Sequence, residues 1–383
     1  MINLSSIIVP GQTIGIIGGG QLGRMMAIAA REKGYCIAVL DPTPNSPCGQ
    51  IADYEFTASF NDLEAIKELA SVSDVITYEF ENIDYEALTW LEQYAYLPQG
   101  SALLKVTQDR GDEKKALQGM NIPTAPYKLV NSEEQLVSAI QEIGVPCVLK
   151  TCRGGYDGKG QFVIRSLEDY HSASALLQYG SCVLESWIPF QLELSVIVVR
   201  SVSGEICTFP VAENIHINNI LHKSIVPARV PIEVIQKAEN VARKIAGNFS
   251  LVGTLAVEMF VTSDGNVLVN ELAPRPHNSG HYTIDACETS QFDQHIRAIC
   301  NLPLGRTTLL RPAVMVNILG QHIPPLLENV SLLSNSKLHL YGKKEAKQNR
   351  KMGHITRLAN TTDDAEKQLD GLPIWEARTE WRI

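Results

Sequence analysis

The sequence predicts a multidomain protein of mixed α/β and α+β class, with a Rossmann-like parallel-sheet domain first and a small strand-rich domain last. Strands alternate with helices along roughly the first hundred residues, which is typical of a parallel sheet. Beyond about residue 127, neighbouring strands are joined by hairpin turns, and the last part of the chain is strand-rich with a basic stretch at 341–354. We place the domains at 1–104, 105–300 and 301–383, with a smaller subdomain at about 112–184.

Composition and charge narrow the class of protein. A chain of 383 residues can bury two or three cores, and its net charge of −9 disfavours a general nucleic-acid or membrane-surface binder. The eight cysteines are scattered without a C-x-x-C pair, which favours reduced thiols over disulfides or a zinc site. We see neither a signal peptide nor an apolar run of the ~18 residues that span a bilayer, so we expect a cytoplasmic protein.

The first domain alternates regularly between the two kinds of element. The apolar pattern predicts strands at 13–18, 36–41 and 74–79 and helices at 21–33, 62–70 and 84–94. This βαβ order predicts a parallel sheet.

A glycine fingerprint follows the first of these strands. Gly18, Gly20 and Gly23 have the G-x-G-x-x-G spacing, and Asp41 ends the next strand, as an acid that binds a cofactor ribose would. The stretch therefore reads either as a dinucleotide site or as a turn of the same shape without that ligand. In the second case Asp41 caps the loop that follows it.

The central part of the chain is mixed. We predict a charged helix over 111–120, ended by Pro123 and Pro126, and a long hairpin over 192–211 that turns at Ser203 and Gly204. Further elements are strands at 147–151, 162–165 and 182–188, helices at 167–177 and 234–249, and two strands that flank 262–266.

A second glycine-rich loop lies between two of these strands. Lys150 ends the strand before it, and four glycines fall within 154–160 together with Lys159. Glycines let backbone N–H groups approach a phosphate, and the lysines and Arg153 add positive charge. The loop lacks the Walker A pattern and continues into a strand. It is therefore either a hairpin that closes over a nucleotide or a plain flexible turn.

Two carboxylates are expected to face each other farther along. A two-residue turn at Asp264 and Gly265 pairs Glu258 with Glu271 across an antiparallel hairpin. Directly opposed like charges repel, and a shared Mg²⁺ removes that penalty. A neighbouring Lys or Arg is the alternative. Asn270 points to the opposite face of an ideal strand, although it lies close to the strand end.

Together these motifs resemble the ATP-grasp superfamily over nearly the whole chain. More closely, the sequence is similar to the N5-carboxyaminoimidazole ribonucleotide synthetase family, ATP-dependent carboxylases of purine biosynthesis. The segments that carry this resemblance are 18–25, 77–83, 108–110, 149–161, 270–283 and 341–356, of which the last two are the most specific. The resemblance implies an ATP-grasp fold with a pre-ATP-grasp domain that holds neither NAD nor FAD.

The resemblance also implies a ligand set. It implies ATP with Mg²⁺, or Mn²⁺ in its place, bound by Glu258 and Glu271. The implied ATP contacts are Arg110, Lys150, Gly155, Tyr156, Asp157, Gly158, Lys159, Gly160, Gln161, Glu185, Ser186, Trp187, Ile188, Glu193, His216, Asn270 and Glu271.

The other implied substrates are bicarbonate and 5-aminoimidazole ribonucleotide. Their implied contacts are Gln21, Leu22, Glu79, Tyr156, Arg275, His277, Asn278, Lys343, Arg350 and Lys351. Arg275, His277, Asp157 and Lys159 are the implied catalytic residues, with the general base left open between His277 and Asp157. Plainer roles stay open for some of them: structural for His216, an ordinary strand carboxylate for Glu193, and a solvated surface for Lys343 and Arg350.

Two rival functions remain at this point. One is the formate-dependent glycinamide ribonucleotide transformylase or another ATP-grasp carboxylate–amine ligase, and the other is a nucleotide-binding sensor without catalysis. Intact Lys150, Lys159, Glu258 and Glu271 disfavour the sensor. The resemblance implies a homodimer without nucleic-acid or membrane partners.

Overall fold

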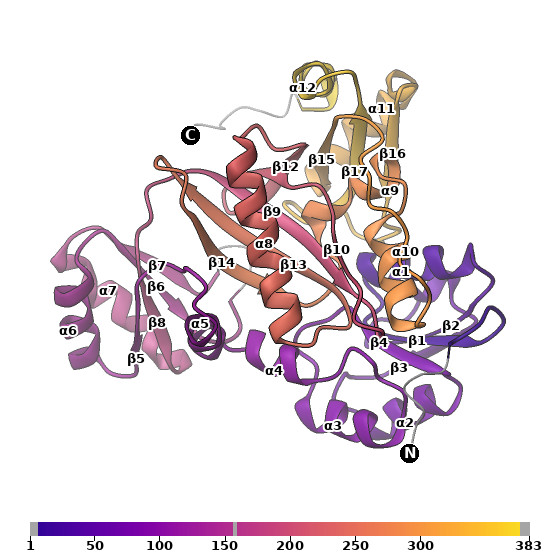
Figure 1. Ribbon diagram of the computed structural model, residues 1–383, viewed down its shortest axis with the longest axis horizontal. Coiled ribbons are helices and arrows are strands. Elements are labelled where there is room, and N and C mark those ends of the chain that lie inside the picture. Colours follow the sequence, from indigo (N-terminus) through magenta and orange to yellow (C-terminus); the bar gives the residue numbers. More distant parts are fainter. Residues whose placement is uncertain (1–6, 156–158, 376–383) are drawn as a thin grey trace.

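A computed structural model describes residues 7–155 and 159–375. It contains three β-sheets, one in each of three bodies that meet around a common centre (Figure 1). The N-terminal body lies at lower right in Figure 1, a small antiparallel body lies at left, and the largest sheet crosses the middle and continues into the C-terminal strands.

The N-terminal sheet is parallel, as predicted, with strand order β3-β2-β1-β4. The sequence analysis missed β3, because its side chains lie at an exposed sheet edge and show no apolar run. The strands are β1 (Thr13–Ile17), β2 (Cys36–Asp41), β3 (Tyr54–Thr57) and β4 (Val75–Tyr78), and the helices are α1 (Gln21–Arg31), α2 (Leu63–Ser71) and α3 (Tyr85–Tyr94).

The small body, here called the lid, is an antiparallel sheet with order β5-β8-β6-β7. Its strands are β5 (Tyr127–Val130), β6 (Cys147–Thr151), β7 (Gln161–Ile164) and β8 (Cys182–Ser186). The sequence analysis missed α6 (Glu133–Ile143), which begins where the Ser132 hydroxyl accepts a hydrogen bond from the Gln135 N–H. The helix predicted over 167–177 is wrong in extent, since only α7 (Tyr170–Ser174) is α-helical and 3₁₀ turns flank it.

The large sheet has nine strands in the order β14-β13-β9-β11-β12-β15-β17-β16, with β10 paired to β9. Its strands are β9 (Phe190–Arg200), β10 (Ile206–Thr208), β11 (Ala212–Ile217), β12 (Ile220–Val226), β13 (Gly253–Thr262), β14 (Val267–Ala273), β15 (Ala313–Leu319), β16 (Ser336–Leu340) and β17 (Lys351–Leu358). Because β12 pairs with β15, strands on both sides of residue 300 share one sheet. The domain limits themselves stay predictions.

Helices cover the large sheet and join it to its neighbours. The predicted helix over 234–249 is α8 (Ile232–Asn248), which buries an alanine-rich face against β9 and crosses the front of the sheet in Figure 1. α10 (Gln291–Ile299) packs against α1 and shares its core. The remaining helices are α4 (Ala102–Thr107), α5 (Arg110–Gly119), α9 (Thr283–Ala286), α11 (Ile323–Glu328) and α12 (Thr362–Asp370).

A buried polar chain joins the N-terminal sheet to the large sheet. The Thr254 N–H donates to His295 Nδ1 at 3.1 Å, so His295 Nε2 carries the proton that meets Thr77 Oγ1 at 2.8 Å. The Thr77 hydroxyl donates to the side-chain oxygen Oε1 of Gln99, and Gln99 Nε2 donates to the backbone carbonyl of Pro274 at 2.8 Å. The chain of donors thereby fixes the backbone just before Arg275. Among the helices described here, none is long and apolar enough to cross a membrane.

Candidate active site

A cleft of about 990 Å³ opens between the lid and the large sheet, here called the central cleft. All three bodies contribute to its lining. The implied residues that line it are Gln21, Leu22, Glu79, Arg110, Lys150, Gly155, Lys159, Gln161, Glu185, Ser186, Trp187, Ile188, Glu193, His216, Glu258, Asn270, Glu271, Arg275, His277, Asn278 and Lys351. Within the described residues, Gly160, Lys343 and Arg350 do not line it. Tyr156, Asp157 and Gly158 lie outside the described residues.

The opposed carboxylates of the hairpin are present as predicted. Glu258 on β13 pairs with Glu271 on β14. The predicted two-residue turn is wrong, because the bonds between Thr262 and Asn266 close a longer loop in which Gly265 adopts φ +74°. A β-bulge after Glu258 shifts the register back by one residue and restores the pairing.

The bulge also explains how Asn270 reaches the cleft. Asn270 is the extra residue on β14, since Val269 pairs with Met259 and Glu271 with Glu258. An extra residue breaks the strict alternation of side chains and re-aims its own. Asn270 and Glu271 therefore both line the central cleft, where an ideal strand would point them to opposite faces.

Electrostatic repulsion is built into this hairpin. Burial, followed by the nearby charge of Glu271, raises the pKa of Glu258 to about 7. On the adjoining strands, His216 Nδ1 lies 3.1 Å from Glu193 Oε2. Burial of His216 disfavours its charged form, but the carboxylates of Glu193 and Glu258 outweigh burial and raise its pKa. The carboxylate oxygens of Glu258 and Glu271 are of the kind that a hard divalent cation such as Mg²⁺ prefers as ligands.

The lid side of the cleft holds a buried ion-pair triad. Glu185 on β8 lies 3.2 Å from Lys150 Nζ and 3.2 Å from Lys114 Nζ. Burial alone would raise the pKa of Glu185, but the two ammonium groups lower it below its usual range. The sequence analysis missed Lys114, which has a 2% exposed side chain and donates to the Asn270 carbonyl at 3.4 Å. The triad thus links the lid strand β8 to the hairpin of β13 and β14.

We expect Lys114→Met to lower the free energy of unfolding by about 1–3 kcal/mol, since Glu185 loses a buried charged partner. Lys150 keeps part of the compensation, so the loss stays below that of a fully broken buried pair. Lys115→Met is the matched control, because Lys115 is 58% exposed and pairs with Asp112 at the surface. Chemical denaturation of both variants measures the difference. Equal stability of the two would contradict the role of the triad.

The glycine-rich loop spans the ends of β6 and β7, and the predicted hairpin is confirmed by the pairing of Lys150 with Gln161. Arg110 holds its base by donating to the carbonyls of Thr151 at 3.1 Å and Gly155 at 3.2 Å. A Cβ on Gly155 would lie 2.8 Å from the Lys159 carbonyl, which explains the glycine. Arg153 is ion-paired with Asp109.

The segment after β14 turns two basic side chains into the cleft. Arg275 Nε lies 2.9 Å from Glu81 Oε1. His277 Nδ1 accepts from the Ser279 N–H at 3.3 Å, so in the neutral ring the proton sits on Nε2, which lies 3.4 Å from Glu258. Burial, followed by the charge of Arg275, lowers the pKa of His277 well below its usual value, which keeps the ring neutral.

The N-terminal glycine turn is filled by the protein itself. The Gly20 N–H donates to Glu79 Oε1 at 2.6 Å, and the Gly19 N–H donates to Asp41 at 2.7 Å. These are the N–H groups that a dinucleotide phosphate would need. Asp41 also accepts from the Thr43 N–H at 2.8 Å, so it caps the following loop.

We therefore expect no specific binding of NAD, NADP or FAD. A phosphate at this turn would meet the carboxylates of Glu79 and Asp41, and like charges at that distance repel. Calorimetric titration checks this, with ATP titrated into the same protein as the positive control. Micromolar binding of any of these dinucleotides would contradict the assignment.

The basic run after β16 approaches the cleft through one residue. Lys351 lines the cleft, Lys343 donates to the Lys351 carbonyl at 2.7 Å, and Arg350 donates to the Glu345 carbonyl at 3.1 Å. Gln50 Nε2 donates to the Gly342 carbonyl at 2.8 Å and so ties this run to the N-terminal body.

Besides Lys114, the sequence analysis missed Glu81, Glu113 and Ser279. Glu113 accepts from the Leu272 N–H at 3.2 Å, and burial followed by the charge of Glu271 raises its pKa to about 8. Both Glu113 and Lys114 belong to a helix predicted only as charged. The sequence did offer one signal for these two residues. Both are charged, yet they lie on the face of the helix that packs inward.

Comparisons with known proteins agree with this geometry. Residues 11–108 match the ribonucleotide synthetase preATP-grasp domain, residues 115–292 the ATP-grasp domain, and residues 313–368 the phosphoribosylaminoimidazole carboxylase C-terminal domain. The chain is 62% identical to an N5-carboxyaminoimidazole ribonucleotide synthase of Bacillus subtilis, covering 94% of each chain. Its identity to the Brucella melitensis synthase is 44%, covering 92% of this chain and 98% of that one.

Solved structures show the same likeness. An N5-carboxyaminoimidazole ribonucleotide synthetase in complex with ADP has a TM-score of 0.96 and 62% identity, covering 98% of this chain and all of that one. The Aspergillus clavatus synthase, solved with ADP and 5-aminoimidazole ribonucleotide, has a TM-score of 0.88 and 34% identity, covering 97% and 98% of the two chains. The predicted fold class is confirmed, and the chain belongs to the N5-carboxyaminoimidazole ribonucleotide synthase family of ATP-grasp ligases.

Proposed function

We propose that this protein uses ATP and bicarbonate to carboxylate 5-aminoimidazole ribonucleotide on its exocyclic amine, releasing ADP and phosphate, in purine biosynthesis. One observation carries the proposal. The opposed Glu258 and Glu271 face the glycine-rich loop and Lys150 across the central cleft, in a chain 62% identical to a named synthase along 94% of its length. The expected ligands are ATP, bicarbonate and the ribonucleotide.

ATP fits the space between the lid and the large sheet. Lys150 and the loop from Gly155 to Gln161 would hold the phosphates, and the segment from Glu185 to Ile188 would meet the adenine. Glu193 would meet the ribose, and His216, whose Nδ1 lies 3.1 Å from Glu193, would make a further contact with the nucleotide. Glu258 and Glu271, with Asn270 beside them, fit a Mg²⁺ ion, because a shared cation removes the repulsion between two carboxylates paired across a hairpin. That ion, or Mn²⁺, would neutralise charge on the transferred phosphoryl group.

The first step would be phosphorylation of bicarbonate. A bicarbonate oxygen attacks the γ-phosphorus, the bond to the bridging oxygen of ADP breaks, and carboxyphosphate forms. Arg275 keeps its Nε on Glu81 and donates from Nη1 to the Pro276 carbonyl at 3.2 Å, so its remaining N–H groups would hold the bicarbonate and the developing charge. Lys159 on the loop would act on the γ-phosphate. Closing the cleft excludes water, which would hydrolyse carboxyphosphate.

The second step joins carbon to the amine. The amine nitrogen attacks the carbon of carboxyphosphate and displaces phosphate, or it attacks carbon dioxide after phosphate has left. In both routes a base takes one proton from the nitrogen. His277 offers only a protonated Nε2 to the cleft while Ser279 occupies its Nδ1. We therefore assign His277 to orienting and hydrogen-bond donation. Asp157, the other proposed base, lies outside the described residues.

The ribonucleotide fits the end of the cleft where the N-terminal and C-terminal bodies meet. Gln21, Leu22 and Glu79 line it from one side and Lys351 from the other. Asn278 is 8% exposed, and neither amide atom finds a hydrogen-bond partner within the described part of the chain. A substrate that hydrogen-bonds to this amide would remove that cost. Lys343 and Arg350, which belong to the same basic run as Lys351, are proposed to bind the 5′-phosphate.

Release of ADP tests the function. We expect release with ribonucleotide and bicarbonate together and none when either is withheld. Replacing bicarbonate with formate, or the ribonucleotide with glycinamide ribonucleotide, should give no turnover. Turnover with formate and glycinamide ribonucleotide would instead establish the transformylase.

We propose a cytoplasmic homodimer that binds neither nucleic acid nor membranes. Light scattering of the purified protein, with and without ATP, tests the dimer. A monomer under both conditions would contradict it.

A further inference from the structure

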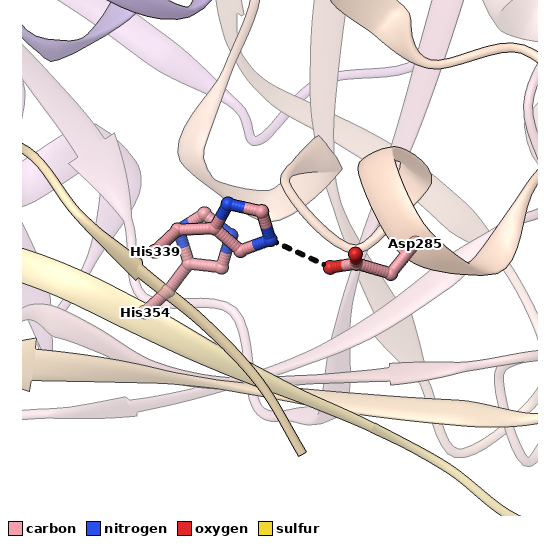
Figure 2. Close-up of side chains that lie close together, drawn as sticks. All are labelled: Asp285, His339 and His354. Atoms are coloured by element: carbon pink, nitrogen blue, oxygen red, sulfur yellow. Dashed lines mark hydrogen bonds and ion pairs between the residues drawn. The ribbon is translucent and has the colours of Figure 1, made fainter. Parts of the chain in front are cut away.

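A second group of metal-ligating side chains lies outside the ATP-binding side of the cleft. Asp285 on α9, His339 on β16 and His354 on β17 each offer one ligand atom, and these atoms all lie within 4.8 Å of one another. Figure 2 shows the two imidazoles stacked, with the Asp285 carboxylate facing the edge of the His339 ring. His339 Nε2 lies 2.9 Å from Asp285 Oδ2, and the ring centroids are 4.6 Å apart.

His354 supplies the observation that a salt bridge alone does not explain. Its side chain is fully buried, and its Nε2 has no hydrogen-bond partner among residues 7–155 and 159–375. A buried polar atom without a partner is costly, so native proteins keep few of them. Its other nitrogen, Nδ1, lies 2.9 Å from the Tyr341 hydroxyl. With Nδ1–H donating to Tyr341, the unpartnered Nε2 presents a lone pair.

The surroundings keep this lone pair available. The rings of His281, His339 and Tyr341 surround the His354 ring at centroid distances of 4.9, 4.6 and 5.7 Å. Neutral imidazole is the form that binds metals, and bound histidines commonly donate their other N–H to an oxygen. Tyr341, held on the far side of the His354 ring, is such an oxygen.

We propose that Asp285, His339 and His354 bind a divalent transition-metal ion of the Zn²⁺ class, with a fourth position open to water. Two imidazoles and one carboxylate suit such ions, whereas Mg²⁺ prefers oxygen ligands alone. Ligand atoms around a tetrahedral ion with bonds of 2.0–2.1 Å lie about 3.3 Å apart. The 2.9 Å pair already has nearly that spacing, and the ion replaces the proton between His339 and Asp285. The two rings are stacked with an interplanar angle of 20°, so one ring turns on metal binding to bring both in-plane lone pairs onto the ion.

Such an ion would fasten two segments that approach the active site. Asp285 follows the stretch that contains Arg275 and His277, whereas His339 and His354 belong to the hairpin that carries Lys343 and Lys351. The metal is therefore expected to be structural. This inference does not depend on the proposed carboxylation.

Cobalt binding tests the site directly. Protein without a polyhistidine tag is titrated with Co²⁺ in excess Mg²⁺, so that the oxygen site at Glu258 and Glu271 is filled. We expect one equivalent of Co²⁺ to give visible absorption of tetrahedral strength, and Zn²⁺ to displace it. His339→Ala and Asp285→Asn should lower the affinity at least tenfold. Both side chains are partly exposed, at 31% and 12%, so these variants should fold.

Controls separate this site from nonspecific binding. His171→Ala removes an exposed histidine of α7 and should leave cobalt binding unchanged. Three results would overturn the proposal: absorption of octahedral strength only, thiolate charge-transfer bands that indicate cysteine ligands, or the same affinity in His339→Ala as in the unaltered protein.

Discussion

Replacing Glu271 by glutamine will abolish turnover while leaving the fold intact. Glu271 and Glu258 are the paired carboxylates proposed to hold Mg²⁺. A bound metal contributes several kcal/mol to stabilising transition-state charge, and each 1.36 kcal/mol is tenfold in rate, so we expect kcat to fall on the order of a thousandfold. Steady-state rates at limiting and saturating Mg²⁺ measure the effect. Unaltered activity at limiting Mg²⁺ would contradict the metal assignment.

Glu271→Gln is expected to raise the stability of the metal-free protein, although it abolishes turnover. The pKa of Glu258 is raised from its usual value to about 7 in the folded protein, so the folded state binds more protons than the unfolded state between about 4.5 and 7. Stability contributed by this group therefore falls as pH rises through that window. Removing the charge of Glu271 relieves part of the loss. In metal-free buffer the Glu271→Gln melting temperature should exceed that of the unaltered protein at pH 7 and above, with a smaller difference near pH 4.5.

Replacing Arg275 by alanine will lower kcat on the order of 10²–10³-fold, the usual cost of losing one group that stabilises transition-state charge. Its guanidinium pairs with Glu81 and lines the central cleft, where we propose that bicarbonate binds. ATP is proposed to contact other residues, so KM for ATP should change little. Steady-state kinetics with each substrate varied in turn tests this. A loss confined to KM for ATP would contradict the assignment.

A second variant separates catalysis from stability. Burial raises the pKa of Glu81, and Arg275 opposes this rise. Arg275→Ala therefore leaves a partly buried carboxylate without its partner, which lowers stability. Adding Glu81→Gln should restore the melting temperature but not kcat. Recovery of kcat in the double variant would show that Arg275 acts only by holding Glu81.

Local patterns in the sequence predicted the elements that carry the chemistry. The parallel N-terminal sheet, the hairpin at the glycine-rich loop and the pairing of Glu258 with Glu271 are all present. That pairing was reached through a wrong turn, because a longer loop and a β-bulge cancel each other. Turn type and bulges depend on backbone strain and tertiary contacts, which a strand pattern does not contain.

Contacts between residues far apart in the chain could not be predicted from the sequence. Lys114 meets Glu185 across 71 positions of the chain and Asn270 across 156, so only the fold makes them neighbours. The glycine fingerprint failed to distinguish a ligand from the Glu79 carboxylate for a related reason. Gly20 and Glu79 are 59 positions apart, yet the side chain fills the turn. The missed β3 lacked an apolar run of its own. In contrast, α6 carried a capping Ser132 and apolar residues at helical spacing (Leu136, Ala139, Ile140 and Ile143), so the local signal was present and was overlooked.

The most direct test of the account follows oxygen from bicarbonate. With [¹⁸O]bicarbonate, ATP and 5-aminoimidazole ribonucleotide, the proposed attack of a bicarbonate oxygen on the γ-phosphorus leaves that oxygen on phosphate when the C–O bond later breaks. Mass spectrometry of the released phosphate should show one ¹⁸O per turnover. Phosphate without ¹⁸O, released at the rate at which the carboxylated product forms, would contradict the phosphorylation of bicarbonate in the central cleft.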